Sequence, residues 1–333
     1  MTPAGPDRRP TLADVAARAG VSTALASIVM REAPGASATT RERVRRAAEE
    51  IGYRPDSRAR LLRSSRSRLL GVVFGVQHAF HGDLVSGLYA AAERVGYELA
   101  LSAVTPGRDE RRAVAGLLSD RCEALVLLGP HSPTAALADL AARLPVVVVA
   151  RSVRSAAVDV VRTADAEGMH LAVDHLVALG RRDVVHVDGG RAPGAAERRR
   201  GFREAARRHG LEARVVAGGL TEDDGAAAAR ALLAGPLPTA VTVFNDRCAL
   251  GVLDELRRAG RAVPGEVAVV GYDDSRIARL ATVDLTSVAQ DVAQLTTLAV
   301  GRAVARLDGT PVERRELVVP PRLVVRSTTA SPR

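Results

Sequence analysis

The sequence predicts an α/β protein with a small helical unit at the N-terminus and a larger part made of doubly wound parallel sheets. Three observations predict this class. Residues 1–68 hold fourteen Arg and seven Asp or Glu, a net charge of +7, whereas the whole 333-residue chain carries +9. Helix caps are closely spaced between residues 11 and 52. From Leu69 onward, short apolar runs alternate with amphipathic segments.

Composition excludes several classes of protein. A chain of 333 residues is too long for one ordinary core, and 47% hydrophobic with 26% charged residues fits a soluble protein. Cys122 and Cys248 form neither a pairing ladder nor a metal motif. No signal peptide is apparent, and the apolar runs are far shorter than the ~20 residues of a membrane helix. We therefore expect a cytoplasmic protein with no membrane, metal or cofactor.

The first two helices should form a helix-turn-helix. Thr11 to Asp14 is a capping pattern that starts one helix, and Gly20 ends it. Only two residues separate this helix from a new cap at Ser22, so the second helix, Thr23–Met30, must turn sharply away.

A third helix should run from a cap at Ser37 to about Ile51, where Gly52 ends it. The segment 53–67 that follows is rich in Arg. It is too short to form a hydrophobic core, and we expect it to be largely disordered in isolation. It should become helical where phosphates neutralise its charge and a second copy packs against Ala59. Three helices alone would equally fit an ordinary bundle; the basic stretch favours polyanion binding.

The larger part alternates eight strand-length apolar runs with helical segments, which implies parallel sheets covered on both faces. The runs lie at Leu69–Val76, Leu99–Val104, Ala124–Leu128, Val146–Ala150, Val184–Val187, Arg214–Ala217, Ala240–Phe244 and Val267–Gly271. The helical segments lie at Asp83–Val95, Glu110–Leu118, Met169–Leu179, Ala195–His209, Gly225–Ala234 and Asp246–Ala259. No GxGxxG or GxxxxGK[ST] motif follows any of these runs, so the sequence does not indicate a dinucleotide-binding site or a P-loop.

The N-terminal blocks resemble the headpiece of the lac repressor family. TLADVA at 11–16, GVS at 20–22, TRERV at 40–44 and GYRP at 52–55 occur in order and at the family's spacing. Later blocks extend the resemblance over nearly the whole chain, at Val173–Leu176, Arg198 with Gly201-Phe202, Phe244–Asp246, Val270–Asp274 and Ser287–Asp291.

The resemblance implies three parts: a helix-turn-helix headpiece over 10–56, a hinge helix or linker over 57–67, and an effector-binding and dimerisation domain over 68–330. The last is expected to have the two lobes of a type I periplasmic binding protein. One lobe should comprise about 68–164 with 292–319, and the other 165–289 with 320–330.

The resemblance also implies that the second helix lies in the major groove of DNA and that a hinge leucine wedges into the minor groove. The positions that carry over are Thr11, Ser22, Thr23, Ala24, Ser27, Ile28, Arg31, Tyr53, Ala59 and Leu62. Leu25, Ile28 and Arg31 replace the family's frequent Thr, Arg and Asn. Ile28 cannot make the bidentate hydrogen bond to guanine that Arg makes, so we expect it to contact a thymine methyl group. The alternative is that Ile28 faces the core of the helical bundle.

Ligands of open α/β sheets bind at the carboxyl ends of strands. There the resemblance places an effector site made of Gln77, Phe80, His81, Arg151, Arg198, Asn245, Asp273 and Gln290. Guanidinium donors, carboxylate acceptors and amides suit a hydroxyl-rich ligand. Ala150 stands where the family often has Asp. Without the resemblance, Asp273 would be expected only to cap a loop, and Arg198 to pair with surface acids.

We interpret the chain as a ligand-responsive, sequence-specific DNA-binding regulator, a repressor of carbohydrate genes released by a sugar-like effector. A homodimer would bind a near-palindromic operator with half-sites about one helical turn apart. The C-terminus shows no leucine heptads, which favours a dimer over a tetramer.

Other readings stay open. The absence of Trp and an aromatic content of 2% weaken the case for sugar stacking and leave a nucleobase or another metabolite possible. A secreted solute-binding protein is disfavoured, because no signal peptide is apparent in the sequence. An α/β enzyme could use Asp246, Asp273 and Asp274, but no Gly-x-Ser-x-Gly elbow, metal motif or phosphate loop is present. We therefore expect no enzymatic activity.

Overall fold

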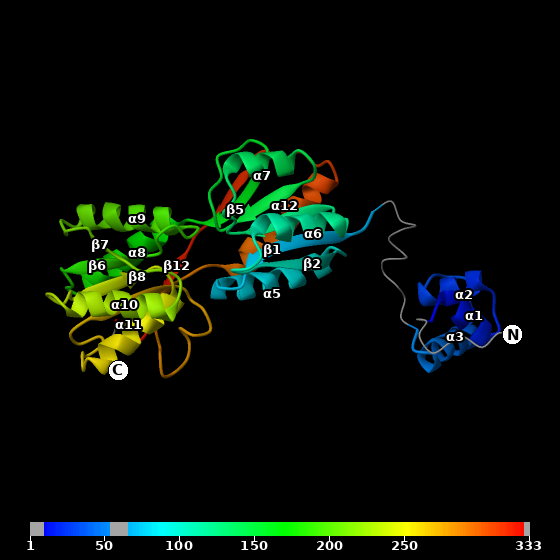
Figure 1. The fold of residues 1–333 in the computed structure, drawn as a ribbon, viewed down its shortest axis with the longest axis horizontal. Helices are drawn as coiled ribbons and strands as arrows, with labels where there is room; N and C mark the ends of the chain where they lie inside the picture. The colour runs from blue at the N-terminus through cyan, green and yellow to red at the C-terminus, as the bar shows by residue number, and fades with distance from the viewer. Residues whose placement is uncertain (1–9, 54–65, 330–333) are drawn as a thin grey trace. The chain divides into compact units, whose positions relative to one another are not determined.

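A computed structural model describes residues 10–53 and 66–329 of the chain. It divides into two compact units, Met1–Ser67 and Arg68–Arg333 (Figure 1). The predicted hinge at 57–67, with Ala59 and Leu62, lies outside the described residues except for its last two positions.

The N-terminal unit contains the three predicted helices. They are α1 (Leu12–Ala19), α2 (Thr23–Met30) and α3 (Ala38–Glu50). Thr11 and Asp14 form a capping box, and the hydroxyls of Ser22 and Ser37 each accept a backbone N–H at the start of the next helix. Gly20, at φ 62°, adopts the left-handed conformation that ends α1, which confirms the predicted helix punctuation.

The core of this unit is small and built from short side chains. Its buried members are Val15, Ala16, Ala19, Ala26, Val29, Val44, Ala47 and Ala48. Because these residues come from all three helices, a change in any one helix affects the packing of the other two.

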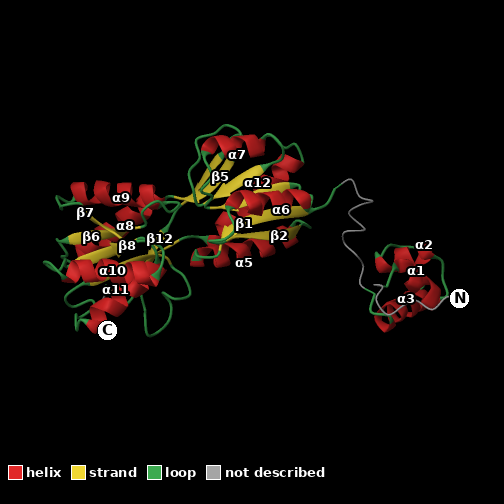
Figure 2. Cartoon of the chain, in the orientation of Figure 1, coloured by secondary structure: helices red, strands yellow, loops and turns green. Residues whose placement is uncertain are grey.

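The first lobe of the second unit is a six-stranded parallel sheet in the order β11-β5-β4-β3-β1-β2. Its strands are β1 (Leu69–Gly75), β2 (Glu98–Val104), β3 (Ala124–Leu128), β4 (Val146–Val149), β5 (Asp159–Thr163) and β11 (Glu316–Val319). Its helices are α5 (Ala79–Arg94), α6 (Glu110–Ser119), α7 (Thr134–Ala141) and α12 (Val292–Leu307). The core under α5 and α12 is separate from the core under α6 and α7, so helices cover both faces (Figure 2).

The second lobe repeats this plan in the order β12-β10-β9-β8-β6-β7. Its strands are β6 (Val184–Asp188), β7 (Arg214–Ala217), β8 (Ala240–Val243), β9 (Ala268–Asp273), β10 (Thr286–Ala289) and β12 (Arg322–Val324). Its helices are α8 (Asp165–Ala178), α9 (Ala195–Arg208), α10 (Glu222–Leu233) and α11 (Asp246–Arg258). The strands are parallel except for β12, which runs antiparallel to β10. The predicted fold class is confirmed.

The chain passes between the two sheets three times within the described residues. It leaves the first sheet after Thr163, returns after Ala289 and leaves again after Val319. Each sheet therefore receives its last strand from a segment far along the chain.

The strands β5, β10, β11 and β12, and the helices α7 and α12, are not among the predicted apolar runs and helical segments. The two last strands, β11 and β12, are short edge strands, and their apolar stretches are only two or three residues long and mostly half-buried or exposed. The helix α12 carries Thr296, Thr297 and Gly301 in its interior, which blurs the helical pattern.

Among residues 10–53 and 66–329, no single helix has the length and apolar composition needed to cross a membrane. The helices α1 and α2 meet those criteria only as a pair, and a bend of 105° separates them.

Candidate functional site

The start of α2 presents small polar side chains to solvent. Ser22, Thr23 and Ala24 are exposed, and the Ser22 hydroxyl accepts the backbone N–H of Leu25 at 3.2 Å. Ile28 is half-buried and is not part of the core cluster; a β-carbon on Gly35 would lie 3.9 Å from its Cγ2. This face can therefore meet a partner with hydroxyl, methyl and branched apolar groups.

The remaining predicted DNA contacts are partly engaged within the unit. Thr11 and Asp14 bond to each other in the capping box, and half-buried Tyr53 packs against the core. The backbone carbonyl of half-buried Ser27 accepts from Nε of Arg31 at 3.1 Å, while the Arg31 side chain stays exposed.

Arginine charge on α3 is only partly neutralised. Glu50 accepts ion pairs from Arg46 at 3.1 Å and from Arg18 of α1 at 2.6 Å. Both guanidinium groups lower the pKa of Glu50, and Arg18 has the larger effect. In the described part of the chain no carboxylate pairs with exposed Arg43 or Arg31. Unpaired cations remain available for phosphates.

In the second unit, Arg198 of α9 is the centre of a buried polar cluster and is only 6% exposed. Its Nε donates to Asp165 Oδ1 at 2.8 Å and its Nη1 to the carbonyl oxygen of Phe244 at 2.5 Å. Its guanidinium carbon lies 3.5 Å from the ring centroid of Tyr272. Burial alone would lower the pKa of Arg198, but Asp165, Tyr272 and Asp273 together raise it above its ordinary value.

Asp273 ends β9 with an unusual backbone, at φ 107°. Its Oδ1 lies 3.7 Å from Nη2 of Arg198 and accepts from Nε2 of Gln290 at 2.8 Å. Burial raises the pKa of Asp273 to about 8, against the opposing attraction of Arg198. Gln290 also accepts from the Thr163 hydroxyl at 2.6 Å, so one amide joins the end of β5 in the first lobe to the end of β9 in the second.

Asn245 is used as a helix cap. Its Oδ1 accepts the backbone N–H of Cys248 at 2.8 Å, and its Nδ2 donates to the carbonyl oxygen of Leu220 at 3.2 Å. Both polar atoms therefore help to position the start of α11.

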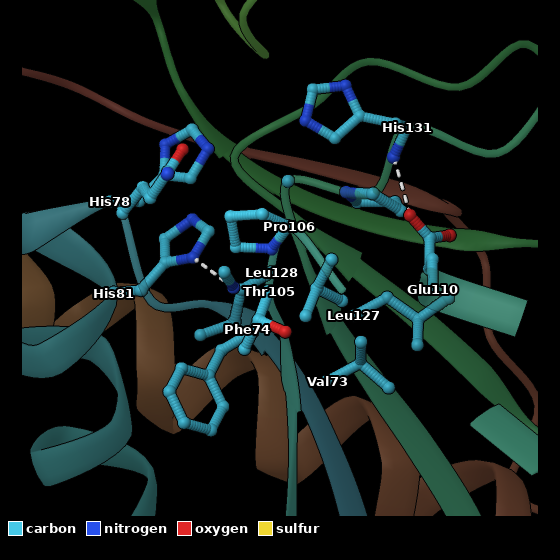
Figure 3. A pocket seen from close by; sticks show the side chains of 15 residues that line it. Val73, Phe74, His78, His81, Thr105, Pro106, Glu110, Leu127, Leu128 and His131 are labelled. Carbon is cyan, nitrogen blue, oxygen red and sulfur yellow. Dashed lines mark hydrogen bonds between the residues drawn. The ribbon is translucent and has the colours of Figure 1, made fainter. Parts of the chain in front are cut away.

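On the first-lobe side, a cavity of about 320 Å³ opens at the ends of β1, β2 and β3 (Figure 3). We name it the first-lobe cavity; its polar lining residues are Gln77, His78, His81, Thr105, Glu110 and His131. The predicted residues Gln77 and His81 are among them.

The other two first-lobe residues of the predicted site lie elsewhere. Phe80 packs in the core under α5 and does not line the cavity. Arg151 donates through Nη1 to the carbonyl oxygens of Pro130 and Ser132, each at 2.7 Å, and so holds the segment that carries His131.

Sequence reasoning missed three residues of this region. Asp165, in the first turn of α8, is the partner of Arg198. Asp188 ends β6 and pairs with Arg199, while its Oδ1 has no hydrogen bond within the described residues. Arg247 bonds Glu222 through Nε at 2.9 Å and donates through Nη1 to the carbonyl oxygen of Gln77 at 3.1 Å, across the two lobes. A strand-end position marks Asp188, but no sequence pattern marks Arg247.

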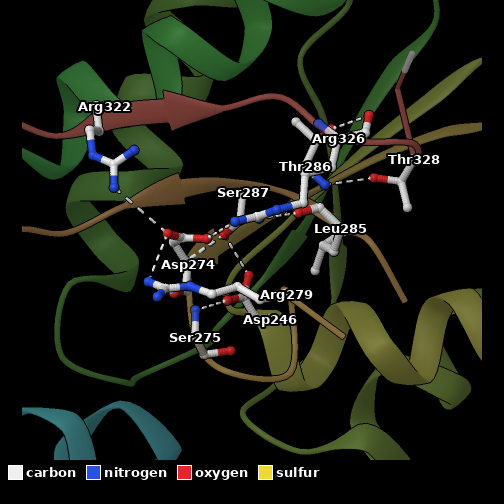
Figure 4. Close-up of polar contacts among 10 residues, drawn as sticks. All are labelled: Asp246, Asp274, Ser275, Arg279, Leu285, Thr286, Ser287, Arg322, Arg326 and Thr328. Atoms are coloured by element: carbon white, nitrogen blue, oxygen red, sulfur yellow. Dashed lines mark hydrogen bonds and ion pairs between the residues drawn. The ribbon is translucent and has the colours of Figure 1, made fainter. Parts of the chain in front are cut away.

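The carboxylates of Asp246 and Asp274 are part of a cluster of hydrogen bonds and ion pairs (Figure 4). Asp246, 1% exposed, accepts from the Ser287 hydroxyl at 2.6 Å and the Ser275 backbone N–H at 2.7 Å, and burial raises its pKa to about 6. Asp274 pairs with Arg326 at 2.5 Å and Arg279 at 3.0 Å. Among the described residues, no set of His, Cys, Asp or Glu has the arrangement needed to hold a metal ion. The cluster fastens the C-terminal segment to the second sheet.

Both units match known proteins. Residues 11–56 match bacterial regulatory proteins of the lacI family, and residues 173–329 match the periplasmic binding protein-like domain. The chain is 31% identical over 335 residues to the HTH-type transcriptional regulator GalR of Escherichia coli (strain K12), an alignment that covers 97% of this chain and 96% of GalR.

Three solved structures are similar. A LacI transcriptional regulator from a Rhodococcus species is 52% identical with a TM-score of 0.76, over 78% of this chain and 98% of that one. The lac repressor dimer bound to operator and the anti-inducer ONPF is 29% identical with a TM-score of 0.82, over 97% and 100%. The complex of the transcriptional regulator CelR with cellobiose is 31% identical with a TM-score of 0.72, over 96% and 100%.

Proposed function

The chain belongs to the lacI family of bacterial regulatory proteins, and from this membership we propose that it is a repressor of carbohydrate uptake or catabolism genes released from DNA by a small sugar-like effector. The relatives reported above are transcriptional regulators, not enzymes. A regulator of this kind needs one surface for DNA and a separate site for the effector, and the two units supply one each.

The N-terminal unit supplies the DNA surface. Thr23 and Ala24 at the start of α2 are exposed where base edges would be read. Arg31 and Arg43, which have no carboxylate partner among the described residues, can meet phosphates. A homodimer would place two such units on a near-palindromic operator. The reported lac repressor structure is itself a dimer bound to operator.

The polar cluster around Arg198 carries the effector half of the proposal. Arg198, Asp273 and Gln290 lie together at the carboxyl ends of the second sheet, and Gln290 also reaches Thr163 of the first lobe. A ligand that breaks these hydrogen bonds, or forms new ones to the same side chains, changes the interactions that hold the two lobes together. Coupling of this kind is typically about 1–3 kcal/mol and is reciprocal, so operator DNA should weaken effector binding by the same factor.

The experiment selects duplexes from the protein's own genome by binding, and then measures anisotropy of a labelled duplex with the full chain. Affinity should fall steeply with rising salt, because several phosphates are neutralised. Sugars are then added to find one that releases the duplex. The variant Asp273→Asn should keep the duplex affinity and lose the release, whereas Asp254→Asn, on an exposed face of α11, should keep both. A protein that binds no selected duplex at low salt overturns the proposal.

A further inference from the structure

The two compact units of the chain divide between Ser67 and Arg68, so Arg68 is the first residue of the second unit. The backbone of Arg68 is left-handed, at φ 50°. This conformation costs free energy for a residue that carries a β-carbon, and it persists only where the surrounding contacts hold it. The contacts of Arg68 therefore show how the second unit holds the chain that arrives from the three N-terminal helices.

The start of the neighbouring strand β3 holds Arg68 from one side. The half-buried side chain of Glu123, one residue before β3, accepts the backbone N–H of Arg68 at 2.9 Å. The backbone N–H of Glu123 in turn donates to the carbonyl oxygen of Leu69 at 2.8 Å. The second carboxylate oxygen of Glu123 accepts from the hydroxyl of Tyr97 at 3.4 Å, and Tyr97 packs in the core under α5 and α12. One carboxylate therefore ties the Arg68 backbone to a buried aromatic side chain.

The start of β2 holds Arg68 from the other side, because β1 lies between β2 and β3 in the sheet. The Arg68 carbonyl oxygen accepts the backbone N–H of Glu98, the first residue of β2, at 2.9 Å. The guanidinium carbon of Arg68 lies 5.8 Å from the ring centroid of Tyr97, and a β-carbon on Gly96 would lie 3.3 Å from Nη1. We call the contacts of Arg68 with Glu123, Tyr97 and Glu98 the exit clamp.

An exit clamp that opens gives the residues before β1 more conformational freedom. If both helical units of a dimer must bind one duplex, DNA binding has to remove this freedom again in each chain, which weakens the binding. The added length of the connecting segment matters less, because effective concentration falls only as about the −3/2 power of length. The clamp therefore contributes by holding backbone in place before DNA arrives.

We propose that Glu123 is a positioning residue for DNA binding: through the backbone N–H of Arg68 it fixes where, and in which direction, each chain leaves the second unit. Glu123 touches no DNA in this proposal and lies at the opposite end of β3 from the first-lobe cavity, which Leu127 and Leu128 line. The inference rests on the proposed function and adds a residue that belongs neither to the DNA surface nor to the effector site.

The test measures the anisotropy of the selected duplex with the full-length parent and with variants at one salt concentration. Glu123→Ala should bind about tenfold more weakly, since ordering one further backbone residue on binding costs about this factor. The direction of the change is informative. Removal of a carboxylate makes the protein more basic, so electrostatics alone would strengthen its binding to DNA. A loss of affinity therefore cannot come from the change in charge.

Three further variants separate positioning from charge and from stability. Glu123→Gln keeps an oxygen that accepts the Arg68 N–H, and it should bind within about twofold of the parent. Glu98→Ala removes the same charge from an exposed position at the start of β2 and should bind at least as tightly as the parent. Ser102→Ala removes a buried hydrogen bond to the carbonyl oxygen of Ala113 in the same lobe, and its affinity for the duplex should equal that of the parent.

Hydrogen exchange measured by mass spectrometry on the same preparations reports the exit clamp without DNA. In Glu123→Ala the peptide that contains Arg68 and Leu69 should exchange about tenfold faster, while peptides from β4 keep the parent rate, because only the clamp opens.

Three results overturn the inference: Glu123→Ala binds the duplex as tightly as the parent, Ser102→Ala loses as much affinity as Glu123→Ala, or the exchange of Arg68 is unchanged in Glu123→Ala. In each case the parent still binds its duplex, so the regulator proposal stands and only the positioning role of Glu123 falls. A parent that binds no duplex is instead the failure of the proposed function, and the positioning role falls with it.

Discussion

The two lobes of the second unit hold the polar groups at their strand ends in different ways. On the second-lobe side, Arg198 is paired with Asp165, and Asp273 is bonded to Gln290. On the first-lobe side, His78 and His81 stack on each other, and in the described part of the chain neither pairs with a carboxylate. Breaking a buried ion pair costs far more than changing a neutral ring. The difference teaches that the second-lobe polar groups are held by ion pairs and hydrogen bonds that form on folding, whereas the first-lobe imidazoles are held without an ion pair.

The largest effect should come from breaking the buried pair. Arg198→Met leaves the Asp165 carboxylate buried without its cation, so the free energy of unfolding should fall by about 3–5 kcal/mol. Urea denaturation measures the change. Arg200→Met, two residues along α9 and 63% exposed at its side chain, should change it by less than about 0.5 kcal/mol. Equal losses in the two variants would remove the contrast between the two sides.

The pH dependence of stability sharpens the same comparison. The pKa of Asp273 is raised from its ordinary value of 3.8 to about 8, so the folded protein holds this proton more tightly than the unfolded chain does. Its contribution is complete below pH 4 and is lost as pH rises to 8. Asp273→Asn should therefore flatten the decline in stability between pH 4 and 8, by an amount on the order of a few kcal/mol.

Chemical denaturation at a series of pH values measures this slope. The pKa of Asp246, raised by burial to about 6, contributes a decline of the same sign. Because the Asp246 charge is one cause of the raised pKa of Asp273, the two carboxyl groups titrate together, and Asp273→Asn should reduce the decline without abolishing it. Asp254→Asn, at an exposed carboxylate, should leave the slope as in the parent protein. A slope unchanged by Asp273→Asn would mean that this side chain is not protonated preferentially in the folded state.

The smallest stability effect should come from the bond that crosses between the two sides. Arg247 is partly exposed, so Arg247→Met should lower the free energy of unfolding by about 1 kcal/mol or less. The same variant frees the carbonyl oxygen of Gln77 from the second lobe, and effector affinity should change by more than the stability does. Calorimetry and urea denaturation on one preparation compare the two, with Arg258→Met as an exposed control. Effector affinity equal to that of the parent would show that the bond does not couple the lobes.

Much of the fold was predictable because local signals agree with the packing. Thr11, Ser22 and Ser37 are caps in the sequence and in the structure, and the buried strands β3 and β4 are continuous apolar runs. The strands β11 and β12 were not predicted because their apolar stretches are only two or three residues long, and their pairing with distant strands defines them.

The candidate site was predictable in outline but not in its contacts. Arg198, Asp273 and Gln290 were expected together, and the structure brings them together. Asn245 was expected to contact the ligand, yet its amide caps a helix, because a strand-end position suits either use. Asp165 and Arg247 depend on side-chain reach between segments far apart in the chain, which residue spacing does not report.

The edge strands β11 and β12 have a consequence for synthesis. The three helices of the N-terminal unit are complete in the sequence by residue 50, whereas the last strands of both sheets are formed by residues 316–324. Since chains emerge from the ribosome N-terminus first, a nascent molecule carries a finished helical unit while each lobe still shows an unpaired sheet edge. In a chain made in this order, the three N-terminal helices are finished before either sheet has its last strand.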